Sequence, residues 1–489
     1  MTATTAEKFK RYLQKTGLDC KDYQVKGVEW CVDHEVNGYK IQEDIPVIRG
    51  GIIADEMGLG KTIQMLGTVV SNFKTRTLIV LPKALLDQWQ KVIVKTLGHQ
   101  PLVYHHFTKK KKLEMIEKLK RSPIVLTTYG MIAINKKKKE ENALHHIQWD
   151  RVIYDEAHHL RNNSTGEYAG ALKIQSQIRW MVTGTPIQNK ADDLYSLFDI
   201  LKVPRKIYTK NEDALDLLVS QLILHRTKES VGLILPPLSF ETQQVAWETN
   251  TEKRTAQKYH KDISMCIAET GASGAELDEE KLSMLLAMLR CRQTCILSAL
   301  IEYKRLQQNL LNQKTGNINS SKTNAVIEKI VERKDNGKKK IIFCHYRGEI
   351  DYIKTVLTTV HQITVAVIDG RTPDAERREI LQPQSQAPQM QMHMQAPEQP
   401  QVLILQIQTG CEGLNLQTFS EVYFVSPHWN PAVEDQAIAR CHRIGQTEET
   451  AVFRFYMNGF DEAAMTQSLD SYILAVQTQK KQIVSDILW

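Results

Sequence analysis

The stretch Gly51–Thr62 (GIIADEMGLGKT) has the residue types and spacing of a phosphate-binding loop. A short apolar run precedes the glycine turn and a helical pattern follows it, so backbone N–H groups and a helix N-terminus point at one anion. Lys61 adds a charge for the terminal phosphates, and the Thr62 hydroxyl is a magnesium ligand. The strict consensus has glycine where this chain has Asp55. Taken alone, the stretch also fits a glycine turn with a solvated lysine.

Two adjacent carboxylates, Asp155 and Glu156, follow an apolar strand that ends at Tyr154. Neighbouring side chains at a strand end point in different directions, so the two groups have different tasks. We expect Asp155 to hold a magnesium ion and Glu156 to polarise the attacking water. An acidic helix N-cap is the alternative. The segment Thr183–Asn189 (TGTPIQN) also follows a strand, and its small residues suit a tight junction beside this pair.

Three side chains in the second half, Gln436, Arg440 and Arg443, are spaced four and three residues apart. We expect them on one helix, where this spacing puts all three on one face. Two arginines aimed at one point can neutralise the charge that develops on a transferred phosphoryl group. Without the other motifs, the alternative interpretation of these three residues is that the arginines form ion pairs at the surface. The phosphate loop and the acidic pair favour catalysis.

Both halves of the chain alternate short apolar segments with helical patterns, which predicts an α/β protein with two parallel sheets covered on both faces. Ligands of such sheets lie beyond the carboxyl ends of the strands. The predicted strands are Gly51–Ala54, Thr77–Leu81, Ile124–Thr128, Arg151–Tyr154 and Trp180–Thr183, then Lys340–Cys344, Thr364–Ile368, Val402–Ile407, Val422–Val425 and Ala451–Tyr456. Helical patterns at Leu217–Leu224 and Lys281–Leu311 predict a helical insertion between the two sheets.

The composition, with 42% hydrophobic and 24% charged residues over a length of 489, is that of a soluble globular protein. No run approaches the ~18 apolar residues of a membrane span. The N-terminal stretch has no apolar core of signal-peptide type. We therefore expect a soluble protein that is not secreted and has no membrane partner. The eight cysteines are scattered, which predicts reduced thiols, and the net charge of +7 permits a polyanionic partner.

These residues resemble the Swi/Snf-type (Snf-family) DNA-translocating ATPases of helicase superfamily two. The matching motifs, in family order, are DEMGLGKT (55–62), LIVLPKALLDQW (78–89), LTTYG (126–130), DEAH (155–158), VTGTPIQN (182–189), KIIFCHY (340–346), GLNL (413–416), HWNPAVEDQA (428–437) and ARCHRIGQ (439–446). Two segments, Arg179–Asn189 and Leu285–Cys295, are most similar to the branch of postreplication-repair and Lodestar-like ATPases. The ring-type zinc domain of some members of that branch has no matching Cys/His spacing here.

The resemblance implies two RecA-like lobes, with a helical insertion between them, that close on ATP and move along double-stranded DNA. It implies ATP and Mg2+ as cofactors, with double-stranded DNA, nucleosomes and an accessory targeting protein as partners, in a nucleus or a viral genome compartment. The implied ATP-binding residues are Tyr23, Gln24, Met57, Gly58, Leu59, Gly60, Lys61 and Thr62, and Thr62 and Asp155 would hold the metal. The implied catalytic residues are Lys61, Asp155, Glu156, Gln436, Arg440 and Arg443. The implied DNA contacts are Lys83, Gln88, Thr127, Thr128, Gly413, Asn415 and Trp429.

The expected domains are a helicase ATP-binding lobe (1–203), a helical protrusion (204–321), a helicase C-terminal lobe (322–458) and C-terminal brace helices (459–489). A Gln/Pro/Met-rich insert at 382–400 predicts a mobile surface loop within the second lobe. The chain departs from the family pattern at His225, where arginine is usual, and at Gln406 and Cys411, where serine and glycine are usual. The last two departures weaken the expectation that this strand end contacts DNA.

Three functions compete. The leading hypothesis is a DNA-stimulated ATPase that moves along double-stranded DNA and remodels or displaces protein–DNA complexes in chromatin remodelling, repair or transcription. A strand-separating DNA helicase uses the same lobes, and an unwinding assay on a forked duplex distinguishes it. A non-enzymatic DNA-binding scaffold is the third. The intact Lys61, Asp155, Glu156 and Arg443 argue against the scaffold.

Overall fold

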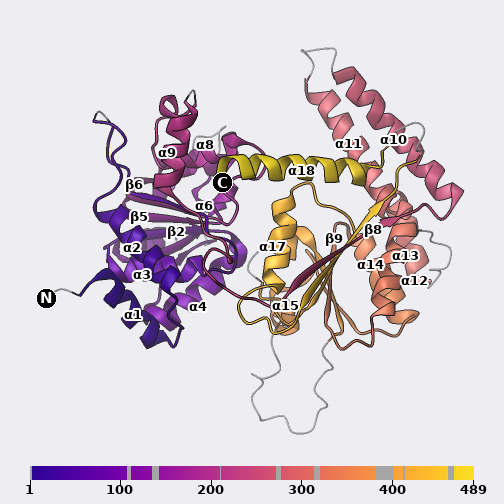
Figure 1. Ribbon diagram of the computed structural model, residues 1–489, viewed down its shortest axis with the longest axis horizontal. Helices are drawn as coiled ribbons and strands as arrows, with labels where there is room; N and C mark the ends of the chain where they lie inside the picture. Colours follow the sequence, from indigo (N-terminus) through magenta and orange to yellow (C-terminus); the bar gives the residue numbers. More distant parts are fainter. Residues whose placement is uncertain are drawn as a thin grey trace, which may run out of the picture. The chain divides into compact units, whose positions relative to one another are not determined.

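The chain folds into two compact units (Figure 1). The computed structural model describes residues 3–43, 45–106, 112–134, 142–209, 211–270, 277–312, 320–381, 400–410, 414–460 and 467–488. Lobe 1 comprises Met1–Ile234 together with Lys480–Trp489, and lobe 2 comprises Leu235–Gln479. Gly413, Cys411 and nearly all of the low-complexity insert lie outside the described residues. In the part of the chain that is described, no helix is long and apolar enough to cross a membrane.

Lobe 1 is built on a parallel sheet whose order, over the described residues, is β3-β4-β2-β5-β6-β1-β7. Its strands are β1 (Gly50–Ile53), β2 (Thr77–Leu81), β3 (Leu102–Tyr104), β4 (Ile124–Thr128), β5 (Gln148–Asp155), β6 (Gln175–Val182) and β7 (Ile223–Leu224). The register pairs Leu81 of β2 with Thr128 of β4, and Val80 with Tyr154 of β5. The carboxyl ends of these three strands therefore meet at one edge of the sheet.

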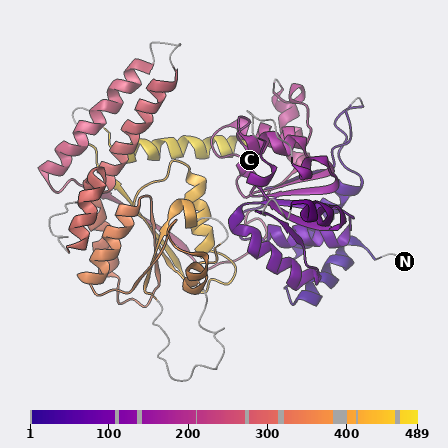
Figure 2. The same cartoon turned by 180° about the vertical axis from the view of Figure 1, so that it is seen from behind.

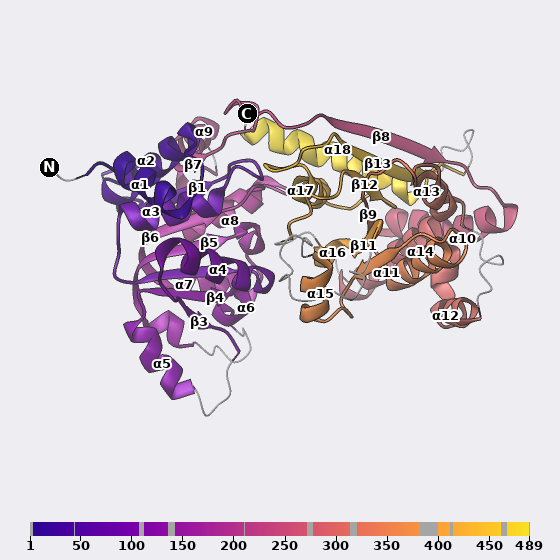
Figure 3. The same cartoon turned by 90° about the horizontal axis from the view of Figure 1, so that it is seen from below.

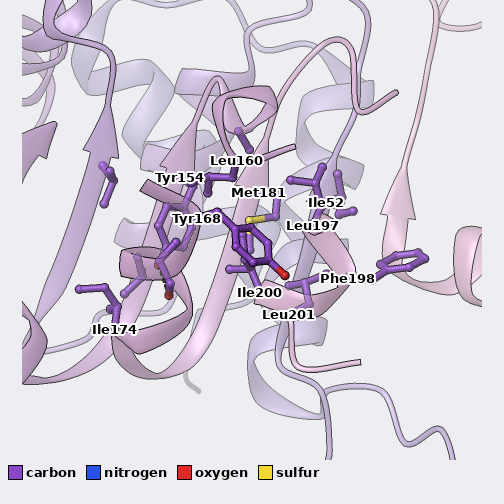
Figure 4. Packing of buried hydrophobic residues seen from close by; sticks show 14 of the residues in the cluster. Ile52, Tyr154, Leu160, Tyr168, Ile174, Met181, Leu197, Phe198, Ile200 and Leu201 are labelled. Atoms are coloured by element: carbon purple, nitrogen blue, oxygen red, sulfur yellow. Dashed lines mark hydrogen bonds between the residues drawn. The ribbon is translucent and has the colours of Figure 1, made fainter. Parts of the chain in front are cut away.

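Helices cover both faces of this sheet. They are α1 (Thr5–Thr16), α2 (Asp22–Val36), α3 (Lys61–Ser71), α4 (Leu86–Leu97), α5 (Lys112–Arg121), α6 (Tyr129–Ile132), α7 (Gly166–Lys173), α8 (Ala191–Ile200) and α9 (Glu212–Leu222). Short 3₁₀ turns are η1 (Lys83–Leu85), η3 (Ala143–His146), η4 (Ala157–Leu160) and η5 (Arg205–Ile207). Along β2, Leu78 and Val80 enter the core under α5 and α7–α9, whereas Ile79 and Leu81 enter the core under α1–α4. Figure 4 shows part of the first of these cores, with Tyr168 and Leu197 packed near Met181. This alternation explains why the strands are apolar throughout.

Lobe 2 has a second parallel sheet, in the order β10-β11-β9-β12-β13-β8 over the described residues. Its strands are β8 (Leu238–Val245), β9 (Lys340–Cys344), β10 (Val365–Ile368), β11 (Val402–Gln406), β12 (Glu421–Phe424) and β13 (Thr450–Met457). β8 runs along one edge of the sheet beside β13 (Figure 3). The two sheets confirm the predicted α/β fold with two parallel-sheet lobes.

The helices of lobe 2 include a long pair, α10 (Asn250–Thr270) and α11 (Leu277–Ile296), which lie side by side and project from the rest of the lobe (Figures 1 and 2). The others are α12 (Tyr303–Leu311), α13 (Ser321–Glu332), α14 (Arg347–Thr359), α15 (Asp374–Leu381), α16 (Ile407–Gly410), α17 (Pro431–Cys441) and the first part of α18 (Leu469–Leu488), with the 3₁₀ turn η6 (Ser298–Glu302). The predicted helical insertion thus corresponds mainly to α10–α12.

The division between the lobes differs from the predicted boundary at residues 203 and 204. α9 and β7 belong to lobe 1, because β7 pairs with β1 in its sheet, so Leu217–Leu224 is only partly helical. β8 belongs to the lobe 2 sheet. The last described residues of α18 belong to lobe 1, where Ile483 and Val484 pack against its core.

A buried ion pair joins α2 to the strand that carries the acidic pair. Arg151 of β5 donates to both carboxylate oxygens of Glu35, at 2.6 and 2.5 Å, and both side chains are fully buried. Trp180 Nε1 of β6 donates to the same carboxylate at 2.9 Å, and Asn72 Nδ2 at 2.7 Å. The network fixes α2, the end of α3, β5 and β6 against one another.

We expect Glu35→Ala to lower the free energy of unfolding of lobe 1 by about 3–5 kcal/mol, because it leaves the Arg151 guanidinium buried without its counter-ion. Denaturant unfolding followed by tryptophan fluorescence measures the loss. The matched control is Glu114→Ala, which removes an exposed pair with Lys118 and should cost about 0.3–0.5 kcal/mol. Equal losses in the two variants would contradict a structural role for the buried pair.

Candidate ATP-hydrolysis site and DNA-contacting residues

The phosphate loop lies between β1 and α3, at the carboxyl end of the lobe 1 sheet. Gly60 caps α3 in the left-handed region, with φ of 81°. A Cβ at this position would lie 2.5 Å from Gln24 Nε2, so only glycine lets this amide approach. Gln24 Nε2 donates to the Leu59 carbonyl at 3.1 Å, and Lys61 Nζ donates to the Asp55 carbonyl at 2.7 Å. The predicted adenine-reading glutamine and the loop are therefore brought together.

Asp55, at the position where the consensus has glycine, anchors the loop. Its buried carboxylate accepts from Arg226 Nε at 2.9 Å and Nη2 at 2.5 Å, and from Gln64 Nε2 at 3.0 Å. The same guanidinium lies 5.6 Å from the centre of the Tyr23 ring. Burial and the Asp55 charge raise the pKa of Tyr23. The sequence gives no signal for the role of Arg226, because its partner lies 171 positions away.

The acidic pair stands where β5 ends. Glu156 adopts the left-handed region with φ of 50°, which is uncommon for a residue with a long side chain and is found at functional sites. Its carboxylate lies 3.4 Å from His158 Nδ1, and that nitrogen lies 3.4 Å from Thr183 Oγ1. The acidic pair and the TGTPIQN segment are therefore joined through His158.

The TGTPIQN segment also packs on the phosphate loop. A Cβ on Gly184 would lie 2.8 Å from Met57 Cγ and 3.3 Å from Lys61 Nζ. Lys61 in turn interacts electrostatically with Asp155. The predicted residues Met57, Lys61, Asp155 and Glu156 thus gather at one edge of the sheet, as the parallel strands require.

Asp155 is held by neutral donors and is strongly desolvated. Trp89 Nε1 donates to its Oδ2 at 2.6 Å, and the Glu156 N–H donates to its Oδ1 at 3.1 Å. Burial and the neighbouring Glu156 carboxylate raise the pKa of Asp155 to about 7, and the Lys61 charge opposes them. Each carboxylate oxygen keeps a lone pair, and Thr62 at the start of α3 offers a hydroxyl. This donor set fits a hard divalent cation such as Mg2+.

The arginine triplet lies at the end of α17, but not wholly on it. The helix ends at Cys441, so Gln436 and Arg440 share a helix face and Arg443 lies in the turn beyond. The prediction of one helix carrying all three was wrong, because Arg443 lies two residues beyond the end of the helix. Arg443 Nε is buried without a hydrogen-bond partner among the described residues. Burial, and then the Arg440 charge, lowers its pKa. A desolvated guanidinium beside a like charge is suited to bind an anion.

The DNA-contacting residues predicted in lobe 1 differ in exposure. Lys83 of η1 and Gln88 of α4 are exposed. Thr127 is buried and its hydroxyl donates to the Tyr104 carbonyl at 2.9 Å, so this side chain does not reach the surface. Thr128 Oγ1 lies 3.2 Å from His105 Nδ1. Burial and the charges of His106 and Lys83 lower the pKa of His105, a neighbour of Thr128 that no sequence motif indicates.

In lobe 2, Asn415 is exposed, whereas Trp429 packs against the core with its ring 6.3 Å from that of Tyr472. Gly413 lies outside the described residues. The DNA contacts of both lobes stay predictions.

Two parallel-sheet lobes, one with a phosphate loop and an acidic pair, define the class of two-lobed ATPases. The family model described as SNF2-related domain matches residues 23–299, and the model described as helicase conserved C-terminal domain matches residues 321–445. The first match spans more than half of the chain. The chain therefore belongs to the SNF2-related ATPases, as the motifs predicted.

Curated relatives come from bacteria, viruses and eukaryotes. An uncharacterized ATP-dependent helicase of Mycoplasma genitalium is 28% identical, over 96% of this chain and 42% of that protein. The "Probable global transactivator" of Orgyia pseudotsugata multicapsid polyhedrosis virus is 26% identical, over 95% of this chain and 91% of the viral protein. The ISWI chromatin-remodeling complex ATPase ISW2 of Saccharomyces cerevisiae is 26% identical, over 94% of this chain and 41% of the yeast protein. The chain thus spans about two fifths of the bacterial and yeast proteins.

A solved structure, the Sulfolobus solfataricus SWI2/SNF2 ATPase core in complex with dsDNA, is 22% identical, covering 96% of each chain at a TM-score of 0.39.

Proposed function

We propose that the protein is an ATP-driven translocase on double-stranded DNA that remodels or displaces protein–DNA complexes. The observation that supports this most is the gathering of Lys61, Asp155 and Glu156 at the carboxyl edge of the lobe 1 sheet, where β2 leads into the exposed Lys83. ATP hydrolysis needs the first three groups, and a polyanionic track needs surface cations of the Lys83 type.

The lobe 1 residues divide the hydrolytic work. The loop N–H groups and Lys61 hold the phosphates, and Glu156 polarises the attacking water. Thr62 and Asp155 would hold Mg2+, which would supply positive charge against the phosphate oxygens. The strained backbone of Glu156 fixes its carboxylate in place before the substrate arrives.

Arg440 and Arg443 stand on lobe 2, which has no phosphate loop of its own in its described residues. We propose that they complete the site when the lobes close on ATP, and that Gln436 positions them. Each cycle of closure and opening then moves two DNA-binding surfaces relative to each other, which is the basis of translocation.

We expect duplex DNA to raise ATP turnover strongly, and more than single-stranded DNA does. Steady-state ATPase assays with duplex, single-stranded and nucleosomal DNA, measured side by side, test this. The half-saturating duplex concentration should rise steeply between 50 and 200 mM salt (roughly 10³-fold for about six phosphate contacts), since those contacts release counterions. Turnover that is the same with and without DNA would overturn the proposal.

The alternatives make different predictions. Strand separation on a forked duplex would show a helicase, and DNA binding without any ATP turnover would show a scaffold. The substrates, an accessory targeting protein and the nuclear or viral compartment are likewise proposals, and a stronger response to nucleosomes than to bare duplex would favour a chromatin substrate.

A further inference from the structure

We propose that Trp89 and Tyr129 relay duplex binding to the hydrolytic acidic pair. The inference rests on the proposed function, because it concerns the way in which DNA speeds ATP hydrolysis. Each aromatic residue belongs to a motif that is predicted to contact DNA, and each donates a hydrogen bond to Asp155.

Trp89 links the first motif, LPKALLDQW, to the carboxylate. Gln88 and Trp89 are neighbours on α4 and point in different directions, since Gln88 is exposed and Trp89 is 1% exposed. The indole Nε1 donates to Asp155 Oδ2 at 2.6 Å, across 66 positions of sequence. A shift of α4 caused by a ligand on Lys83 or Gln88 therefore changes the position of this donor relative to the carboxylate.

Tyr129 links the second motif, LTTYG, to the backbone of the same residue. It follows Thr128 directly, is buried, and donates from its hydroxyl to the Asp155 carbonyl at 2.6 Å. Its ring also stacks on His159 at 5.0 Å between centroids. That carbonyl begins the peptide to Glu156, so Tyr129 holds the unusual turn that aims the second carboxylate.

The two aromatic residues enter from neighbouring strand ends. Leu81, the first residue of LPKALLDQW, pairs with Thr128, which precedes Tyr129. Thr128 itself is buried, so a ligand would act on both hydrogen bonds at once by shifting these two paired strand ends. Neither donor belongs to the nucleotide-binding loop, so a relay should change turnover and leave the ATP concentration at half-saturation unchanged.

The test compares Trp89→Phe and Tyr129→Phe, which remove one donor each and keep the aromatic packing. We expect the ratio of duplex-stimulated to basal kcat to fall about tenfold in each, since each variant loses one hydrogen bond to Asp155 at the catalytic step, to the carboxylate in Trp89→Phe and to the backbone carbonyl in Tyr129→Phe. The KM for ATP and the affinity for duplex DNA, measured by fluorescence anisotropy at fixed salt, should match those of the unaltered protein.

Trp149→Phe is the matched control, because Trp149 is also buried on β5 and donates its indole N–H to a backbone carbonyl, that of Leu144, at 3.1 Å. It should keep the stimulation ratio. A ratio that is unchanged in both test variants overturns the relay. Equal loss of basal and stimulated turnover also overturns it, since both residues would then only support the site. If the unaltered protein shows no stimulation, the proposed function itself fails. If Trp89→Phe fails to fold, Tyr129→Phe alone still tests the relay.

Discussion

Glu156→Gln should lower duplex-stimulated ATP turnover by about 10²–10⁴-fold, the range that a positioned general base contributes. The amide keeps the size of the side chain but cannot polarise the attacking water. The backbone of residue Glu156, at φ of 50°, is held by the end of β5 and by the hydrogen bond from Tyr129 to Asp155. The substitution should therefore leave the fold intact. Steady-state turnover measures the loss, and binding of a fluorescent ATP analogue should be retained.

Two comparisons make this result specific. Lys61→Ala should abolish turnover together with nucleotide binding, because the phosphates lose their counter-charge. Glu117→Gln replaces a carboxylate that is 60% exposed on α5 and pairs with Lys120 at 3.0 Å, so it should leave turnover unchanged. Full activity of Glu156→Gln would refute the assignment of the acidic pair.

The sheets were predictable because their signal is local. A strand that is buried on both faces is a short apolar run, and the predicted Thr77–Leu81, Ile124–Thr128 and Lys340–Cys344 agree with the structure at both ends. β8 gives no such signal. It lies at a sheet edge with most of its side chains exposed, so its sequence LSFETQQV is largely polar. β7 is only two residues long and follows a helix directly.

The functional side chains of the candidate site could be predicted from the sequence, but the residues that hold them in place could not. The motifs identify the charged residues at the strand ends, and the parallel topology of the sheet brings these residues close together. The residues that hold them come from elsewhere in the chain: Arg226 reaches Asp55 across 171 positions, and Trp89 reaches Asp155 across 66. No periodicity encodes such pairs. The end of α17 was misplaced because helical spacing continues through Arg443, whereas the His442 backbone leaves the helix at φ −91° and ψ 83°.

Arg443→Ala should lower duplex-stimulated turnover by about 10³-fold or more, the lower end of the range for an arginine that stabilises transferred phosphoryl charge. The structure gives the reason for expecting so large an effect. Its Nε is buried without a hydrogen-bond partner among the described residues, and the guanidinium interacts with the charge of Arg440. Keeping the guanidinium in this position therefore lowers the free energy of unfolding. The loss should fall on kcat, because lobe 1 binds ATP without it.

Two further variants decide whether the planar guanidinium or only its charge is needed. Arg443→Lys keeps the charge but not the fork of N–H donors, so it should recover only part of the lost turnover. Arg305→Gln removes an arginine from the same lobe that is 77% exposed and pairs with Glu302 at 3.2 Å, and it should have no effect. If Arg443→Ala instead raised the stability of lobe 2 and left turnover intact, this arginine would not serve ATP hydrolysis, and the closure of the two lobes on one nucleotide would lose its main support.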